Sequence, residues 1–357
     1  MKKHLTGKRL RLLILNAALT LGALACLISL RHLEGLLDSQ KAAERWRGET
    51  ELPYCQLSCF LPVDEGVGLD DVYAFRVAML DKLRQAVPDM ERQEGFFTDA
   101  WSLRAKLKIS SDHGRGDAVA LAVGGDFFQF HPLRLVSGTY INESDLMHDR
   151  VLLDEDLAWL LFGGTDLNGL EVRIDGKPFY VAGVIRREQD FASRAAYSDG
   201  MGLLMSYDAY RELAPKAAIS CYEVVMADPV KHFAVNLARE KFPIQNGLIV
   251  QNTDRFSYGT LMKLFTQFGR RSMQTRGILY PYWENAARYV EDCCALLLWL
   301  SQLLALLPVI CLLVWLIRRL QHGWVKLRDD VLPVGLENIQ EGIRVRRRRR
   351  WEKQHRE

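Results

Sequence analysis

Seven cysteines are the side chains in this sequence best suited to redox or metal chemistry, and their spacing decides what they can do. In an extended strand, Cys55 and Cys59 lie on one face about 13 Å apart, which is too far for a disulfide bond. An odd number at irregular spacings is not a disulfide framework, and no C-x-x-C or Cys/His spacing typical of zinc occurs. We therefore expect small, buried, apolar side chains and no metal site. The seven are Cys26, Cys55, Cys59, Cys221, Cys293, Cys294 and Cys311.

Spacings typical of an active site are absent as well. The eight histidines are scattered, no serine lies in a G-x-S-x-G turn, and no motif places two carboxylates together. Gly7-Lys8 is not part of a G-x-x-x-x-G-K-[ST] phosphate-binding loop, so the sequence has no ATP site of that type. We predict that the protein is not an enzyme and has no cofactor. The sequence identifies no catalytic, metal-binding or ligand-binding residue.

Two charged stretches each have a binding interpretation and a simpler structural one. Residues 113–117 (HGRGD) are rich in glycine and charge, and we expect an exposed loop there rather than an adhesive motif. Arg344 and the run 346–350 form a basic cluster, for which contact with anionic lipid is worth about 1 kcal/mol per residue. The alternative is nucleic acid, but no stacking or groove-reading context accompanies the run, so we expect no nucleic-acid partner.

The longest uncharged stretch, residues 293–317, indicates a transmembrane helix. It has 25 residues, and at about 1.5 Å per residue it exceeds the roughly 30 Å hydrocarbon core of a bilayer. Only a helix satisfies its own backbone groups there, so we favour a span over a long buried core helix. Gln302 within it is interpreted as a contact between helices rather than as a transport site.

A second uncharged stretch, residues 12–30, follows a basic start. It predicts either a first membrane helix or a signal peptide, because residues 23–25 (ALA) resemble a cleavage site. The apolar run continues past that site, which favours a retained helix. Ala18, Gly22 and Cys26 form a stripe of small residues that allows a second helix to approach, unless it arose by chance.

The charge distribution predicts the topology. Residues 1–11 carry +5 and residues 318–357 carry +6, so residues 12–317 carry −8 of the chain's +3. Basic outer ends around an acidic centre follow the positive-inside rule. We therefore expect a two-pass protein of the bacterial plasma membrane in contact with membrane lipid, with both termini cytoplasmic and the central domain extracytoplasmic.

The residues between the spans predict an α+β domain. Residues 31–50 are polar and favour a helix, which we expect to extend the first span outward as a stalk. Residues 51–126 begin an α/β subdomain with a strand at 54–63, followed by a helix capped by Asp70 or Asp71 and then by strands.

The second part of this α/β subdomain is expected at residues 201–281. It contains strands near 222–226 and 248–251. A helix is predicted to start at Asp228-Pro229, with proline at the first helical position, and another to run over 255–271.

An inserted β-rich subdomain is expected at residues 127–200. Asp154 should cap a short helix that ends at Gly163, and Asp175-Gly176 should form a type I′ hairpin turn.

Residues 282–292 should form a helical approach to the second span. Four aromatic residues in and beside this approach suit the outer headgroup layer, with a surface groove as the rival interpretation. They are Tyr280, Tyr282, Trp283 and Tyr289.

The β-rich stretch resembles the extracytoplasmic core domain of MacB-type ABC transporter permeases, related to the FtsX-like permeases. The sequence departs from the family pattern at Thr139, where arginine is usual, and at Asn168, where an apolar residue is common. It also has two predicted membrane helices, whereas the typical permease has four. The similarity in order and spacing rests on Leu135, Gly138, Asp145, Val151-Leu152-Leu153, Leu157-Ala158, Leu161-Phe162-Gly163, Asp166, Gly169, Val172, Ile174, Gly176, Phe179, Val181 and Gly183-Val184.

The resemblance implies a non-catalytic membrane subunit of a MacB-like ABC transport system. A separate cytoplasmic ABC ATPase would drive motion that the outer domain relays, or the domain would contact cargo or a partner. Two helices are too few to enclose a pathway, so the chain would need a partner permease or self-association. The alternative is a membrane-anchored extracellular binding or sensing module without transport.

Overall fold

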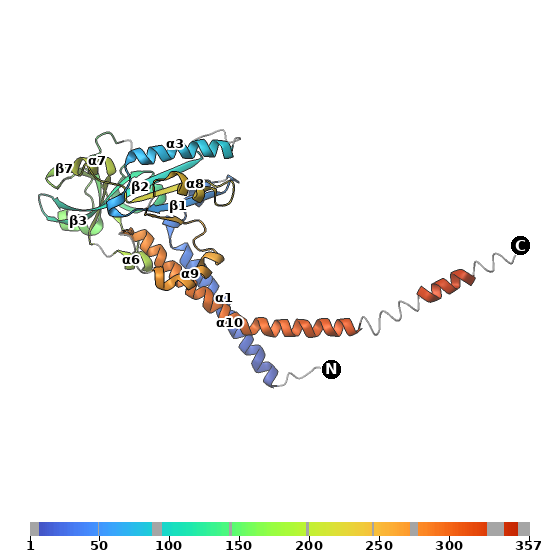
Figure 1. The fold of residues 1–357 in the computed structure, drawn as a ribbon. Helices are drawn as coiled ribbons and strands as arrows, with labels where there is room; N and C mark the ends of the chain where they lie inside the picture. Colours follow the sequence, from blue (N-terminus) through green and yellow to red (C-terminus); the bar gives the residue numbers. More distant parts are fainter. Residues whose placement is uncertain are drawn as a thin grey trace. The chain divides into compact units, whose positions relative to one another are not determined.

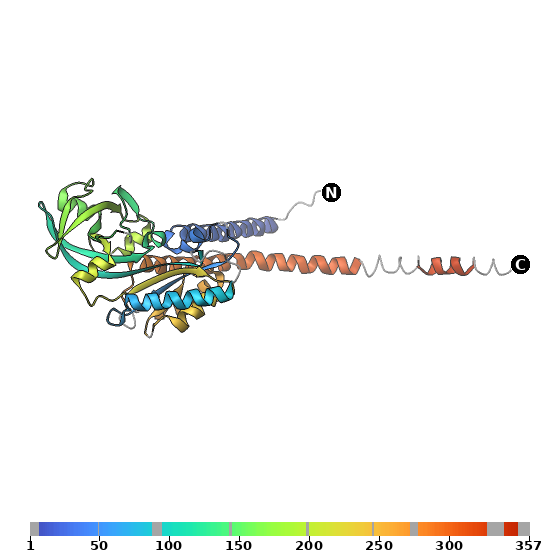
Figure 2. The same ribbon diagram turned by 90° about the horizontal axis from the view of Figure 1, so that it is seen from above.

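The computed structural model describes residues 7–48, 50–87, 95–142, 145–197, 200–244, 246–271, 278–326 and 339–348 (Figures 1 and 2). The chain divides into two compact units. Ser29–Leu298 forms the folded domain, and the other unit combines Met1–Ile28 with Trp299–Glu357. The predicted basic run at 346–350 extends beyond the described residues at positions 349 and 350.

Within the described part of the chain, two helices are long and apolar enough to cross a membrane, and they contain the two predicted spans. They are α1 (Gly7–Gly35) and α10 (Tyr282–Lys326). The predicted approach at 282–292 and the predicted span at 293–317 are one continuous helix. A further helix covers residues 339–348.

Gly22, the middle residue of the small-residue stripe on α1, lies against α10 of the same chain. A Cβ added at Gly22 would lie 3.3 Å from Leu304 Cδ1. One turn and a half earlier on α1, the amide nitrogen of Asn16 lies 3.7 Å from Cys311 Sγ. The two helices therefore pack directly against each other within their unit, as small residues at a helix interface allow.

The prediction of one helical stalk over residues 31–50 is wrong. The helix ends at Gly35, and a 3-10 turn, η1 (Asp38–Gln40), and a short helix, α2 (Ala42–Arg47), follow. Arg45 donates hydrogen bonds to Asp38 O (2.7 Å) and Gln129 O (2.6 Å). Tertiary contacts therefore turn this segment onto the domain, although its sequence favours a continuous helix.

The described strands form one mixed sheet of ten strands in the order β10-β1-β9-β2-β3-β8-β5-β7-β4, with β6 pairing to β2 and β7. The segments predicted as an α/β and a β-rich subdomain thus share a sheet. The strands are β1 (Tyr54–Phe60), β2 (Phe97–Ser110), β3 (Arg115–Gly125), β4 (Arg134–Gly138), β5 (Arg150–Asp154), β6 (Glu171–Ile174), β7 (Lys177–Arg186), β8 (Gly202–Ser206), β9 (Cys221–Ala227) and β10 (Leu248–Gln251).

The β-rich half closes on itself. Its strands pair in the ring β2-β3-β8-β5-β7-β6, and the end of β2 returns to β6 through the pair Ile109↔Ile174. β8, which lies in the segment 201–281, pairs with β3 and β5 of this half. Closure leaves the ring strands without a free edge. Figure 2 shows these mainly green strands beside the half that α3 covers.

The expectation of a loop at residues 113–117 is wrong for residues 115–117. Arg115, Gly116 and Asp117 begin β3 and pair with β2 in register, Ser110 opposite Arg115. Only His113 and Gly114 belong to the turn. A β-hairpin of long paired strands therefore holds the tripeptide in an extended conformation.

The other half of the sheet is covered on both faces. Helices α3 (Leu69–Ala86) and α8 (Phe233–Lys241) lie on one face (Figure 1). Helices α2 and α4 (Phe127–Phe130) contact the other face through β1, β9 and β2. Every residue of β1 and β9 is buried, as expected for strands between two layers. Alternation along β9 directs Tyr222 toward Phe75 of α3, while Glu223 faces the opposite layer.

Two predicted helix starts are shifted. Gly68 is the N-cap of α3, and Asp71 accepts the Gly68 N–H (2.9 Å) from inside the first turn. Helix α8 begins at Phe233 rather than at Asp228-Pro229, and Asp228 instead accepts the N–H of Ala234 (2.9 Å). In both cases the acidic side chain accepts a backbone N–H at the start of the helix without occupying the predicted position.

The local turn predictions in the β-rich half are confirmed. Asp154 caps α5 (Glu155–Phe162) by accepting the N–H of Leu157 (2.7 Å), and Gly163 ends it in the left-handed conformation. Asp175 and Gly176 both have positive φ, 46° and 85°, as a type I′ turn requires. The remaining helices are α6 (Phe191–Ala196), α7 (Tyr207–Leu213) and α9 (Tyr258–Arg271), with the 3-10 turn η2 (Val63–Glu65).

Candidate functional site

The first three turns of α10 lie inside the domain and carry two buried carboxylates. Glu284, Ala287, Glu291, Cys294 and Leu298 repeat at three- and four-residue steps, so they share one helix face. The three apolar members of this face belong to a hydrophobic cluster with α9 and the end of α1. The packing that buries this face therefore also buries the two acids, at 1% and 4% exposure.

Arg255, at the turn between β10 and α9, lies between these two carboxylates. It is 2% exposed. Its Nη2 is 2.6 Å from both carboxylate oxygens of Glu284, and its Nε donates to Glu291 Oε1 (2.9 Å). Its Nη1 donates to Gln40 Oε1 of η1 (2.8 Å). A single guanidinium thus connects α10, the segment after α1 and the end of the sheet, and we call these four residues the ionic joint.

Arg288 adds a second positive charge beside the ionic joint, which itself holds one arginine and two glutamates. Arg288 donates to Glu284 Oε1 (2.7 Å) one turn later and lies over the ring of Tyr280 at 3.6 Å. Two arginines therefore face two glutamates in a region of low dielectric constant. Such a group is costly to assemble but much costlier to leave half formed, because one unpaired buried charge remains.

The ionic joint continues into the sheet as a chain of buried polar groups. Arg255 Nη1 reaches Asn252 Oδ1 (3.5 Å), and Asn252 donates to Ser58 Oγ of β1 (2.7 Å). Ser58 donates to Glu223 of β9 (2.9 Å), which pairs with His131 Nε2 (2.5 Å). His131 and Glu223 are both about 2% exposed. The sheet interior is thus linked to α10 by directional contacts.

The end of this chain contacts α10 a second time. The His131 ring packs on Trp283 at 4.2 Å, and Phe127 packs on His131 at 4.6 Å. Trp283 is 3% exposed and Tyr282 stacks on Tyr197 at 4.1 Å. The headgroup interpretation is therefore wrong for Tyr282 and Trp283, which pack within the domain. Tyr289 is 47% exposed.

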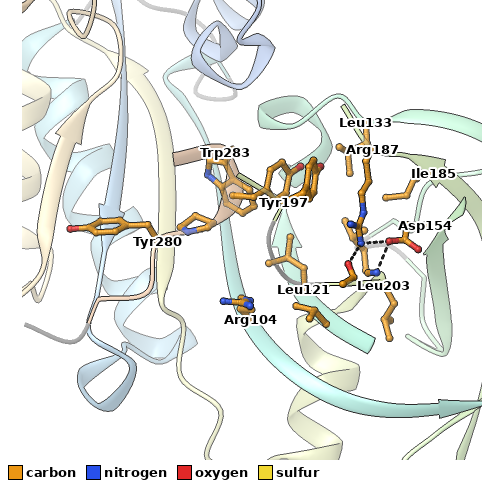
Figure 3. A pocket seen from close by; sticks show the side chains of 16 residues that line it. Arg104, Leu121, Leu133, Asp154, Ile185, Arg187, Tyr197, Leu203, Tyr280 and Trp283 are labelled. Carbon is orange, nitrogen blue, oxygen red and sulfur yellow. Dashed lines mark hydrogen bonds and ion pairs between the residues drawn. The ribbon is translucent and has the colours of Figure 1, made fainter. Parts of the chain in front are cut away.

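A cavity of about 100 Å³ lies between the β-rich half and the start of α10. Figure 3 shows Arg187 and Asp154 on one side and Tyr280 and Trp283 on the other. This placement agrees with the rival prediction that some of the approach aromatics line a groove. The apolar part of the lining comes from Val119, Leu121, Leu133, Ile185, Leu203 and Leu204.

The polar side of this cavity is a compact hydrogen-bonded group. Asp154 accepts the N–H of Gly202 (2.5 Å) and pairs with Arg187, which also donates to Gly200 O. Burial raises the pKa of Asp154, and the positive charge of Arg187 opposes that shift. The Asp154 carboxylate therefore serves as helix cap, turn acceptor and ion-pair partner at once.

A second polar group at the cavity is centred on Glu188. Both Tyr197 and Tyr282 donate to its carboxylate, the latter at 3.1 Å. Burial and the adjacent carboxylate raise the pKa of Tyr197, so its hydroxyl remains protonated and can donate. Arg187 lies over the Tyr197 ring at 4.9 Å. These contacts hold the start of α10 against the β-rich half.

Replacing Asp154 by alanine should lower the free energy of unfolding by about 2 kcal/mol, because α5 loses its cap and the Gly202 N–H loses its acceptor. Urea titration of the full chain in detergent measures this change. Glu155→Ala is the control, since it removes a more exposed pair with Arg186 from the same helix end. Equal losses in the two variants would contradict the role assigned to Asp154.

All seven cysteines are free thiols. Burial raises the pKa of Cys55 and Cys59 to about 12, which makes them unreactive at neutral pH. Within the described ranges, no group of three or more His, Cys, Asp or Glu side chains is placed to hold a metal ion.

Sequence reasoning missed the ionic joint, although part of its signal was present. Glu284 and Glu291 lie seven residues apart on the apolar face of a helix that leads into a membrane span. Acids on an apolar face indicate a buried partner. The position of Arg255 could not be read from the sequence, because only the fold brings the turn after β10 to this helix.

Comparison with known proteins identifies the domain. The family profile of the MacB-like periplasmic core domain matches residues 64–237. No curated protein sequence matches the chain. The periplasmic region of MacB from Actinobacillus actinomycetemcomitans shares 14% identity at a TM-score of 0.40, over 61% of this chain and 94% of that one. The extracellular domain of the noncanonic ABC-type transporter YknZ from Gram-positive bacteria shares 14% identity at a TM-score of 0.37, over 53% and 92%. Residues 64–237 thus belong to the MacB-like periplasmic core domain family, and the chain carries this domain between two helices that can cross a membrane.

Proposed function

We propose that the chain is a non-catalytic membrane subunit of a MacB-like ABC transport system, in which the extracytoplasmic domain relays motion or contacts cargo or a partner. The observation that carries this proposal is the ionic joint. It bonds α10, the helix that contains the second span, to the sheet of the domain through Arg255, Glu284 and Glu291. Membership of residues 64–237 in the MacB-like family supports the transport context.

The physical argument is that a displacement of α10 must either move the domain or break the joint. Separating Arg255 from its two buried carboxylates would expose or strand charges at a cost of several kcal/mol. Moving the joint with the helix costs much less. A pull or rotation of α10 is therefore expected to be transmitted to β1 and β9 through Asn252, Ser58 and Glu223.

The energy for such motion must come from another protein. We propose a separate cytoplasmic ABC ATPase, and either a partner permease or further copies of this chain, since two helices cannot enclose a pathway. In this arrangement both termini are cytoplasmic, and the basic residues of the tail contact anionic lipid. The proposed topology follows the excess of basic residues at both ends.

Affinity purification of the full chain from its native membrane tests this proposal. We expect mass spectrometry to recover an ABC ATPase, together with a permease or a stoichiometric excess of the chain itself. The purified assembly should hydrolyse ATP. Recovery of the chain alone from several mild detergents would contradict the transport role.

The cavity beside Arg187 and Tyr197 favours a second candidate function, a membrane-anchored binding or sensing module. A cavity of about 100 Å³ can hold only a small group, such as one ring or a short side chain. This candidate predicts that the chain purifies without an ATPase and that a small ligand raises its unfolding temperature. Co-purification of an ATPase, with no such ligand effect, would rule it out.

A further inference from the structure

Strand β10 ends the sheet, and its outer edge carries backbone groups that no other described strand uses. Among the described strands it pairs only with β1, and Asn252, directly after it, donates its N–H to Gln56 O (2.8 Å). Because backbone bonds alternate along an antiparallel pair, the N–H and C=O groups of Ile249 and Gln251 point away from β1. Within the described part of the chain, nothing forms a backbone hydrogen bond with these outward groups. They are spaced as a further strand requires.

This edge lacks the features that usually protect the end of a sheet. Its sequence, LIVQ, contains no charged residue and no proline, and its register with β1 runs without a bulge. Isoleucine and valine favour strands. Leu248 is 38% exposed. A regular, apolar edge of this kind pairs readily with another strand.

An open groove of about 650 Å³ runs along the edge. All residues from 246 to 251 line it, rather than alternate ones, so the groove follows the edge of the sheet and not one of its faces. The other walls come from α9 and α10. An edge strand beside a helix is a recurring arrangement for binding an extended peptide. The helical lining residues are Thr260, Leu264, Gln267, Glu284, Arg288 and Glu291.

The walls of the groove favour an extended segment over a folded domain. Helix α9 is fixed in place, because Leu261 packs in one cluster with Val290 and Cys294 of α10. The edge of a second folded sheet could not approach β10 without separating these helices from it. A single strand needs only about 4.8 Å beside β10, and the four residues of β10 match a length of about 13 Å.

The charges around the groove restrict the segment further. Asp254, Glu284 and Glu291 line it with three carboxylates, against the two guanidinium groups of Arg255 and Arg288. The ionic joint and Arg288 pair the two glutamates, and Asp254 lies outside the joint. The lining is therefore negative overall, which disfavours an acidic segment.

We propose that β10 is a docking edge for an extended, uncharged or basic segment of a partner protein, which adds to the sheet as a further strand. The outward N–H and C=O groups of Ile249 and Gln251 bond to its backbone, and its alternate apolar side chains meet Leu248 and Leu264. This inference rests on the proposed contact of the domain with cargo or a partner, and it names the surface and the chemistry of that contact.

Peptide selection on the full chain in detergent tests the inference without an ATPase. A phage-displayed library of random linear peptides of about twelve residues is selected on the chain, and fluorescence anisotropy measures the affinity of the best peptide. Gln251→Pro removes an outward N–H at a position where an edge strand tolerates proline. Gln251→Ala is the matched control, because it loses the same side chain and keeps the N–H. An N-methyl scan of the peptide is the second measurement, since it leaves the protein unchanged.

We expect Gln251→Pro to bind the peptide about fivefold or more weakly than Gln251→Ala, as the loss of one backbone hydrogen bond predicts. N-methylation should weaken binding at every second peptide residue, because only alternate N–H groups of an added strand face β10. Equal affinity of the two variants, N-methyl effects without this alternation, or no peptide selected above background would overturn the proposal.

Self-association of the chain that Gln251→Pro abolishes would also overturn it, because the occupant of the edge would then be a second copy. The result is separable from the transport role. Failure of the peptide test in a chain that co-purifies with an ATPase would remove the docking edge and leave the proposed transport function standing.

Discussion

Replacing Arg255 by methionine should lower the free energy of unfolding of the domain by about 3–5 kcal/mol, because Glu284 and Glu291 would remain as buried charges without their shared partner. For a domain of this size, that loss corresponds to a fall of roughly 6–20 °C in Tm. Methionine keeps much of the volume of the arginine stem, so the lost charge dominates the effect. Thermal unfolding of the full chain in detergent measures it.

Two further variants separate the charge effect from simple disruption. Adding Glu284→Gln and Glu291→Gln to Arg255→Met removes the two buried carboxylates that have lost Arg255, and we expect it to restore part of the lost stability. Arg288→Met is the matched control, because Arg288 is more exposed than Arg255 and contacts only Glu284 of the two carboxylates in the ionic joint. A loss at Arg288 as large as that at Arg255 would contradict the central position assigned to Arg255.

Replacing Gly138 by alanine should be nearly as damaging, at about 3–5 kcal/mol. Gly138 has a φ of +76°, and an added Cβ would lie 2.1 Å from the carbonyl oxygen of Ala182. It pairs directly with Gly183, where an added Cβ would lie 2.5 Å from Ser137 O. At this pair, the contact between β4 and β7 therefore admits no side chain on either strand. Urea unfolding of the full chain measures the loss.

Gly163→Ala provides the comparison for this effect. Gly163 also has a positive φ, +71°, but an added Cβ there meets no atom within 4 Å. We expect a loss of about 1 kcal/mol from the backbone conformation alone. If both variants lose the same free energy of unfolding, the close approach of β4 and β7 does not contribute to stability, and the role assigned to Gly138 is incorrect.

The helix caps and turns of the β-rich half could be predicted closely because their signals are local. Each of these features depends on a few neighbouring residues. They are the cap at Asp154, the helix end at Gly163 and the turn at Asp175-Gly176. The two spans could also be predicted from the sequence, because length and lack of charge suffice to indicate them. The closure of the strands into a ring was not predicted, because it depends on pairing between β2 and β6, far apart in the sequence.

The ionic joint and the true course of residues 31–50 depend on tertiary contacts. Helix propensity favoured a continuous stalk, but the break after Gly35 places Gln40 beside Arg255. The aromatic residues illustrate the same limit. Trp283 was assigned to the membrane surface from its position in the sequence, yet it is buried and packs on His131 within the domain.

The central claim, that the domain follows α10 through the ionic joint, is tested most directly by hydrogen–deuterium exchange on the complex with its co-purified ATPase. Exchange is compared between the nucleotide-free state and the state trapped with ATP and vanadate. We predict that protection changes together in residues 282–292, in 252–255 and in β9. Unchanged protection in 252–255 and β9, while the start of α10 responds to nucleotide, would contradict the account.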